Sequence, residues 1–117
     1  MARVRVSLYL GRPERKLGTG KVRLLEAIRA EGSISAAARS MGMAYRHAWE
    51  MVDDMNRCFR EPVVETSSGG TAGGGATLTP WALELIERFH AIEQATERAI
   101  AAEVAVLEGR LRGSRRR

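Results

Sequence analysis

Three side chains near the start of a predicted helix, Tyr45, Arg46 and Trp49, have the chemistry to contact a nucleic acid. The guanidinium of Arg46 can donate two hydrogen bonds to the O6 and N7 atoms of guanine, or it can bind a phosphate. The hydroxyl of Tyr45 can bind a phosphate, and its ring can contact a thymine methyl group. Trp49 has two interpretations, a groove contact or a side chain that closes the core against the N-terminal strand or the wing. We therefore predict a DNA contact at the first two turns of this helix.

The helix that carries these residues is the second of a predicted pair. Residues 34–41 include three consecutive alanines, which allow another helix to cross at short distance, and Ser33 or Ser35 can cap the start. Gly42 supplies the left-handed conformation that ends this first helix. The second helix runs from residue 43 to residue 57, and its spacing predicts a buried face at Ala48, Val52 and Met55. Two short helices joined in this way are typical of a helix-turn-helix.

A glycine-rich segment follows the helix pair. Residues 63–66 and 76–78 predict two short strands, and residues 67–75 (SSGGTAGGG) predict the flexible tip of a hairpin, the wing. A nucleotide-binding loop requires a lysine and a following helix, and this segment has neither. Residues 18–21 (GTGK) also fail as such a loop, because the surrounding sequence lacks the required first glycine and the final hydroxyl.

The remaining elements flank this region. Residues 3–10 alternate polar and apolar side chains, which predicts a half-buried strand, and residues 11–18 predict a loop. Thr19 can cap a helix over residues 21–30. Pro80, at the first helical position, opens a last helix of roughly 45 Å, which is longer than a domain of this size is wide. Its apolar stripe therefore predicts a homodimer; the alternative is a helix that folds back on its own domain and frays.

Charge is unevenly distributed along the 117 residues, whose net charge is +5. Residues 1–58 hold 11 basic and 6 acidic side chains, residues 59–108 hold 3 and 8, and residues 109–117 hold 5 arginines and no acid. A polyanion is attracted to the first half and to the basic tail, and is repelled by the segment between them. The helix pair lies in the positive half, which favours the DNA interpretation.

Catalytic, metal-binding and membrane functions find little support. One cysteine and two histidines provide neither an internal disulfide nor a metal cluster. The sequence offers no paired carboxylates in a plausible cleft and no nucleophile beside a base, so we expect no enzyme and no metal site. No apolar run of about 18 residues is present and the N-terminus does not resemble a secretory signal. We expect a cytoplasmic protein that is associated with the nucleoid.

The acidic side chains of the second helix leave an alternative open. Glu50, Asp53 and Asp54 repel phosphate, so the helix must leave the groove after its second turn. They are also compatible with a winged-helix module that binds another protein and has no DNA specificity of its own. His47 is expected to pack beside the first helix or to contact a phosphate.

The motifs GSISAAARSMGMAYRHAWEMVDDMN and GGTAGGGATLT, followed by the long last helix, resemble the N-terminal DNA-binding domain of the molybdate-responsive ModE regulators. The resemblance covers residues 3–105, and the first half is also similar to LysR-type regulators. It implies a mainly α (α+β) winged helix-turn-helix with an N-terminal strand, a hairpin wing and a long C-terminal dimerisation helix. The expected parts are a DNA-binding domain over residues 1–78, a dimerisation helix over 79–108 and a disordered basic tail over 109–117.

The resemblance also implies the site residues of a dimeric transcriptional regulator that binds double-stranded DNA at an inverted repeat. The expected DNA contacts are Ser35, Ala44, Tyr45, Arg46, Trp49, Thr66, Ser67, Ser68, Gly69, Gly70, Thr71 and Gly73. The expected dimer interface, through the first and last helices, is Val22, Leu25, Leu85, Phe89, Ile92, Ala99 and Ile100. The family senses molybdate through C-terminal domains that this sequence does not contain, so we expect no cofactor in this chain.

Overall fold

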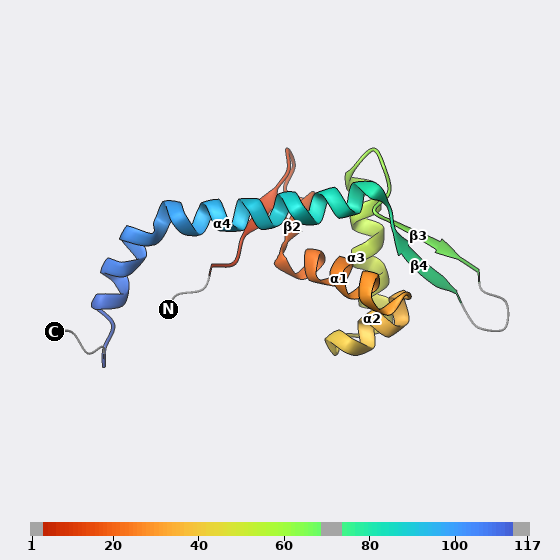
Figure 1. Ribbon diagram of the computed structural model, residues 1–117, viewed down its shortest axis with the longest axis horizontal. Coiled ribbons are helices and arrows are strands. Elements are labelled where there is room, and N and C mark those ends of the chain that lie inside the picture. The colour runs from red at the N-terminus through yellow and green to blue at the C-terminus, as the bar shows by residue number, and fades with distance from the viewer. Residues whose placement is uncertain (1–3, 69–73, 114–117) are drawn as a thin grey trace.

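The computed structural model describes residues 4–68 and 74–113. These residues form a mainly helical α+β fold of winged-helix type, which confirms the expected fold class (Figure 1). The elements in chain order are β1 (Ser7–Tyr9), β2 (Lys16–Gly18), α1 (Thr19–Glu31), α2 (Ile34–Met41), α3 (Tyr45–Cys58), β3 (Val64–Ser67), β4 (Gly75–Leu78) and α4 (Pro80–Gly109). The strands form two antiparallel pairs, β1 with β2 and β3 with β4, and the second pair is the wing.

The predicted helix pair is confirmed, with its turn. Ser33 caps α2, because its Oγ accepts a hydrogen bond of 3.1 Å from the backbone N–H of Ala36. Gly42 ends α2 with φ of 67°, in the left-handed region. Of the two candidate caps, Ser33 is therefore the one used. The side chain of Ser35 is exposed on the first turn of α2.

The core is formed by the inner faces of α1, α2 and α3, the wing and the first part of α4. In α3 the three predicted positions Ala48, Val52 and Met55 are the buried ones. The largest fully buried side chains of the core are Phe89, Leu24, Leu25, Ile28, Met55, Val22 and Val63.

The N-terminal region differs from the expected strand followed by a loop. Residues 16–18 form β2, and Leu8 pairs with Leu17, so the strand finds its partner within a local hairpin. Leu17 is buried, which gives the hairpin an apolar anchor on the core. Thr19 does not cap α1, which begins after Gly18; its Oγ1 instead donates to Glu93 Oε2 of α4 at 3.3 Å.

The last helix begins as predicted and extends beyond the body of the protein. The Oγ1 of Thr79 accepts a hydrogen bond of 3.1 Å from Ala82 N–H, and Pro80 occupies the first turn. The buried residues of α4 end at Phe89, although the helix continues to Gly109 (Figure 1). Across the described ranges, no helix is both long and apolar enough to cross a bilayer.

Four of the expected dimer contacts require a correction. They lie in the core of the single chain, with 5% or less of their surface exposed: Val22, Leu25, Leu85 and Phe89. Burial inside one chain leaves these side chains no surface for a second copy, so they are removed from the expected interface. Ile92, Ala99 and Ile100 lie further along α4 and keep exposed surface.

Polar contacts join α1 to α4. His90 of α4 lies between two carboxylates, with Nε2 at 2.8 Å from Glu26 Oε2 of α1 and Nδ1 at 3.0 Å from Glu93 Oε1. Both contacts favour the imidazolium form and raise the pKa of His90 above its ordinary value of 6.5. The hydrogen bond to Glu26 contributes most, and the one to Glu93 is next.

Candidate nucleic-acid interface

The face of α3 that points away from the core carries alternating charges. Arg46 and Glu50 form an ion pair of 3.7 Å, and Arg57 pairs with Asp53 one turn further on. The side chain of Arg46 is 90% exposed, so this pair is weak and leaves the guanidinium accessible to a ligand. The exposed face therefore presents its most accessible cation at the N-terminal end of the helix.

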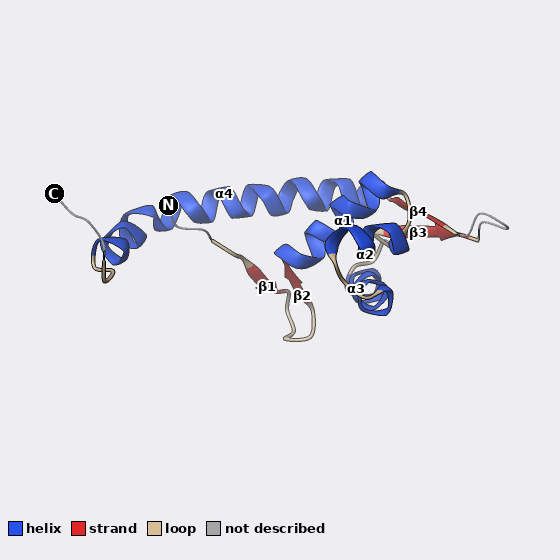
Figure 2. Cartoon of the chain, turned by 90° about the horizontal axis from the view of Figure 1, so that it is seen from below, coloured by secondary structure: helices blue, strands red, loops and turns tan. Residues whose placement is uncertain are grey.

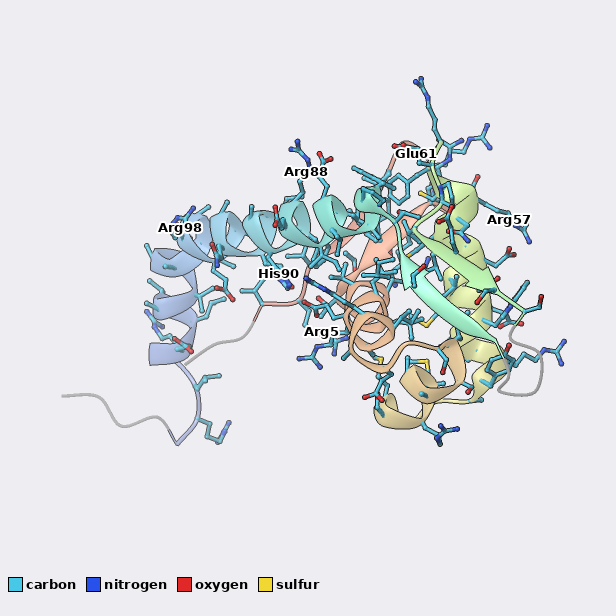
Figure 3. The ribbon with its side chains drawn as sticks, turned by 45° about the vertical axis from the view of Figure 1, so that its right-hand side comes forward. Arg5, Arg57, Glu61, Arg88, His90 and Arg98 are labelled. Carbon is cyan, nitrogen blue, oxygen red and sulfur yellow. The ribbon has the colours of Figure 1, made fainter. Side chains whose placement is uncertain are left out.

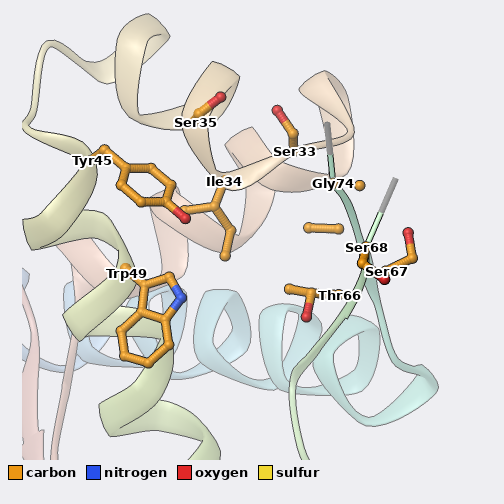
Figure 4. A pocket seen from close by; sticks show the side chains of 11 residues that line it. Ser33, Ile34, Ser35, Tyr45, Trp49, Thr66, Ser67, Ser68 and Gly74 are labelled. Atoms are coloured by element: carbon orange, nitrogen blue, oxygen red, sulfur yellow. The ribbon is translucent and has the colours of Figure 1, made fainter. Parts of the chain in front are cut away.

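A groove lies between this end of α3, the start of α2 and the wing (Figure 4). Tyr45 and Trp49, one turn apart on α3, form one wall and are 55% and 48% exposed. The structure thus places Trp49 on the groove and not in the core. The volume is about 490 Å³, and the lining residues are Ser33, Ile34, Ser35, Tyr45, Trp49, Thr66, Ser67, Ser68, Gly74, Gly75 and Ala76.

The opposite wall of the groove is the wing, with the exposed hydroxyl groups of Thr66, Ser67 and Ser68. Gly74 closes the described part of this hairpin, and a Cβ at this position would lie 2.7 Å from the carbonyl oxygen of Ser67. Only glycine fits such a close approach of the two strands. The small residue is therefore needed by the hairpin itself, whatever the wing contacts.

The wing is attached to α3 by Asn56, a residue to which sequence reasoning assigned no role. Its Oδ1 accepts hydrogen bonds from the backbone N–H groups of Val63 at 2.7 Å and Val64 at 3.3 Å. A further backbone bond of 2.8 Å joins Ala76 N–H of β4 to the carbonyl of Gly32, between α1 and α2. One signal could have indicated Asn56: it is a polar side chain directly after the buried position Met55, in the last turn of the helix that precedes the predicted strand.

Of the predicted DNA contacts that the structure describes, six line this groove, and Ala44 and Arg46 flank Tyr45 at the start of α3. Ser35, Ala44, Tyr45, Arg46, Trp49, Thr66, Ser67 and Ser68 are all exposed. The other four expected contacts, Gly69, Gly70, Thr71 and Gly73, lie outside the described residues. The groove offers hydroxyl groups and two aromatic rings, and the guanidinium of Arg46 is exposed outside its lining, next to Tyr45 in the chain. Such a surface can bind phosphates and contact base edges.

No three His, Cys, Asp or Glu side chains within residues 4–68 and 74–113 are placed to hold a metal ion. His47 is exposed on the first turn of α3, on the flank that faces the β1–β2 hairpin. Cys58 is a half-buried thiol at the end of α3.

Comparison with known proteins adds relatives over most of the chain. The molybdenum-pterin-binding protein MopB of Rhodobacter capsulatus is 48% identical over 86 residues, which are 74% of this chain and 32% of that protein. The molybdenum transport protein ModE of Azotobacter vinelandii is 40% identical over 77 residues, 66% of this chain and 28% of that protein. The DNA-binding transcriptional dual regulator ModE of Escherichia coli K12 is 35% identical over 79 residues, 68% of this chain and 30% of that protein.

The chain therefore spans about a third of the length of the curated relatives that it matches. No family model matches it.

Proposed function

We propose that this chain is a DNA-binding transcriptional regulator of ModE type that binds an inverted repeat as a homodimer. The observation that carries the proposal is the exposure of Tyr45 and Arg46 at the N-terminal end of α3, beside a groove that the wing completes. Similarity to regulators named ModE, over about two thirds of the chain, supports the same function. In a helix-turn-helix this end of the second helix is the part that meets base edges.

In the proposed complex α3 enters the major groove by its first two turns. Arg46 contacts a base edge, and Tyr45 and Trp49 contact bases or sugars along the groove wall. The carboxylates of Glu50 and Asp53, on the exposed side of α3, repel phosphate and turn the rest of the helix away from the duplex.

Flanking contacts in the proposed complex come from hydroxyl groups. Ser35 lies exposed on the first turn of α2, where the unpaired N–H groups of a helix attract a phosphate. Thr66, Ser67 and Ser68 contact the backbone next to the wing. Such contacts fix the register of the protein and leave base choice to Arg46.

The proposed dimer uses the part of α4 beyond Phe89, which projects from the body of the chain (Figure 1). Ile92 is 38% exposed, and Val106 and Leu107 are more exposed still. Antiparallel packing of two such helices about a two-fold axis covers this apolar surface. It also sets two copies of α3 at a fixed spacing, as half-sites about one helical turn or a multiple of it apart require.

Selection from a random-sequence duplex pool tests the DNA proposal. We expect enrichment of a palindrome by the wild type, and a five- to hundredfold loss of discrimination at one base pair in each half-site for Arg46→Ala, on the order of one bidentate contact. Arg88→Ala is the matched control, because it removes another exposed arginine, from the far face of α4 (Figure 3). Failure to enrich any palindrome, with stoichiometric capture of a protein that DNA does not displace, would support the protein-binding alternative.

Sedimentation at several concentrations tests the dimer. Ile92→Glu places a charge on the proposed interface and should weaken association by at least tenfold, whereas Gln94→Glu adds the same charge about 200° away around the helix. A wild-type chain that stays monomeric at high concentration would contradict the dimer.

The proposal assigns no cofactor to this chain. The name of the Rhodobacter relative states that it binds molybdenum-pterin, and the same region of sequence is shared. Adding molybdate to the DNA-binding assay separates the two cases, because a change in affinity would reveal an oxyanion site in this chain.

A further inference from the structure

A cationic surface runs along the flank of α3 that faces away from the wing. We name it the hairpin cleft, because it lies between the β1–β2 hairpin and α3. It consists of two adjoining hollows of about 330 and 400 Å³ that share Lys16, Lys21 and Asp54. Its charged residues are six cations and two acids: Arg5, Arg12, Arg15, Lys16, Lys21, Arg57, Glu14 and Asp54.

Internal pairing neutralises only part of this charge. Lys21 Nζ lies 4.0 Å from Asp54 Oδ2 and donates to the carbonyl of Lys16 at 2.8 Å. Arg12 pairs with Glu14 at 3.7 Å, and Arg57 pairs with Asp53. Within the described part of the chain, the remaining three cations of the cleft make no ion pair: Arg5, Arg15 and Lys16. The cleft therefore keeps an excess of positive charge that no carboxylate among the described residues pairs with.

The position of the cleft on α3 is opposite to that of the wing groove. At 3.6 residues per turn, His47 and Met51, which line the cleft, are about 200° around the helix from Tyr45 and Trp49, which line the groove. Figure 2 looks along α3 and shows the β1–β2 hairpin on one side of the helix and the wing on the other. In the same view the turn of the hairpin extends on the side of α3 that faces away from α4.

The opposite positions of the two hollows on α3 matter for binding a duplex. A helix of about 10–12 Å diameter fills a major groove that is about 12 Å wide. The two sugar-phosphate backbones then pass on opposite sides of the helix. In the proposed complex the wing groove faces one of these backbones, and the hairpin cleft faces the other.

We infer that the hairpin cleft binds the second sugar-phosphate backbone, with Arg5 and Lys16 each contacting a phosphate. These two residues line the hollow that contains His47 and Met51, on the first two turns of α3. The inference rests on the proposed function, because it requires α3 to lie in the major groove. The contacts are independent of sequence: a guanidinium and an ammonium meet phosphate oxygens and no base edge. The hairpin acts as a second wing that adds affinity and holds α3 in register.

Salt-dependent binding of the full chain to two duplexes tests the inference, one enriched from the pool and one of random sequence. The logarithm of the binding constant falls linearly with the logarithm of salt concentration, and each phosphate contact adds about −0.9 to the slope. Arg5→Gln and Lys16→Gln should each lower the log–log salt slope by about 0.9 and weaken binding about eightfold at about 0.1 M salt, equally on both duplexes. The double variant should lower the slope by about twice as much as each single variant. Arg88→Gln makes the same charge change and should leave the slope unchanged.

The outcomes separate the two proposals. If the wild type binds neither duplex, the proposed function fails. If it binds, and Arg46→Ala alters base preference while the hairpin variants keep the wild-type slope, the hairpin inference alone fails. Ethylation interference gives a second readout. For the wild type, ethylation of phosphates in two backbone segments should block binding, and for the double variant one of these segments should no longer have this effect. Thermal melts verify folding, which both exposed positions should leave intact.

Discussion

The side chain of Asn56 on α3 and the backbone of Val63 ahead of the wing are joined by a hydrogen bond of 2.7 Å, in which Val63 N–H donates to Asn56 Oδ1. A second N–H, from Val64, donates to the same oxygen at 3.3 Å, and Asn56 Nδ2 donates back to the Val64 carbonyl at 3.4 Å. This amide therefore helps to fix the angle between α3 and the wing, and thus the shape of the groove.

Replacing Asn56 should therefore loosen the wing. Asn56→Ala leaves two backbone N–H groups without their acceptor, and we expect a loss of about 1–3 kcal/mol in the free energy of unfolding, with weaker DNA binding. Urea denaturation measures the first effect and DNA titration the second. Asn56→Asp keeps both acceptor bonds and should lose less of the free energy of unfolding than Asn56→Ala. Equal losses for the two variants would contradict the role of Oδ1.

Removal of the carboxylate of Glu50 should strengthen DNA binding. Glu50 competes with DNA for Arg46 at 3.7 Å and repels phosphate from the exposed face of α3. Glu50→Gln should tighten binding severalfold at low salt, on the order of one exposed ion pair. Glu87→Gln, on the exposed surface of α4, controls for the change in net charge. Weaker binding by Glu50→Gln would instead indicate that the carboxylate accepts a hydrogen bond from a base.

The turn between α2 and α3 should tolerate no side chain at Gly42. Its φ of 67° is unfavourable for any residue with a Cβ, although the space around it is open, so Gly42→Ala should cost about 1 kcal/mol. Gly20 provides the matched control within α1, where a Cβ would meet only Met51 Cε at 3.9 Å. Gly20→Ala should therefore stabilise the chain by about 0.5–1 kcal/mol. Opposite signs in urea denaturation are the expected result.

The contacts of His90 with Glu26 and Glu93 should make stability depend on pH. Because these carboxylates raise the pKa of His90 in the folded chain, its contribution is fully present below its ordinary pKa of 6.5 and is lost as pH rises through the raised value. The side chain is 46% exposed, so the effect should stay below about 1 kcal/mol. Unfolding free energies at about pH 6 and about pH 9 measure it, and His90→Gln should abolish the difference. A wild type that gains stability over this range, relative to the variant, would contradict the sign.

Much of the helix pair could be predicted because its signals are local. Gly42 must adopt a left-handed conformation, and the spacing of Ala48, Val52 and Met55 fixes the inner face of α3. Once that face is buried, Tyr45 and Arg46 must point outward. The cap was left between Ser33 and Ser35, and the structure selects Ser33 because its Oγ reaches Ala36 N–H.

Other features depend on which elements meet across the chain. Residues 16–18 form a strand because Leu8 pairs with Leu17, a pairing that their own spacing does not reveal. Val22 and Phe89 have the apolar pattern of either a core or an interface, and only the packing of α4 on α1 decides for the core.

The sequence by itself determined the four helices, the strands of the wing, the outward face of α3 and the excess of charge in the first half, since helix periodicity, glycine conformation and net charge act over a few residues. The tertiary structure alone decided that Asn56 holds the wing, that Trp49 faces the groove and that Arg5 and Lys16 flank the first two turns of α3. Those relationships join residues that lie far apart along the chain, and the packing of side chains in three dimensions brings them together.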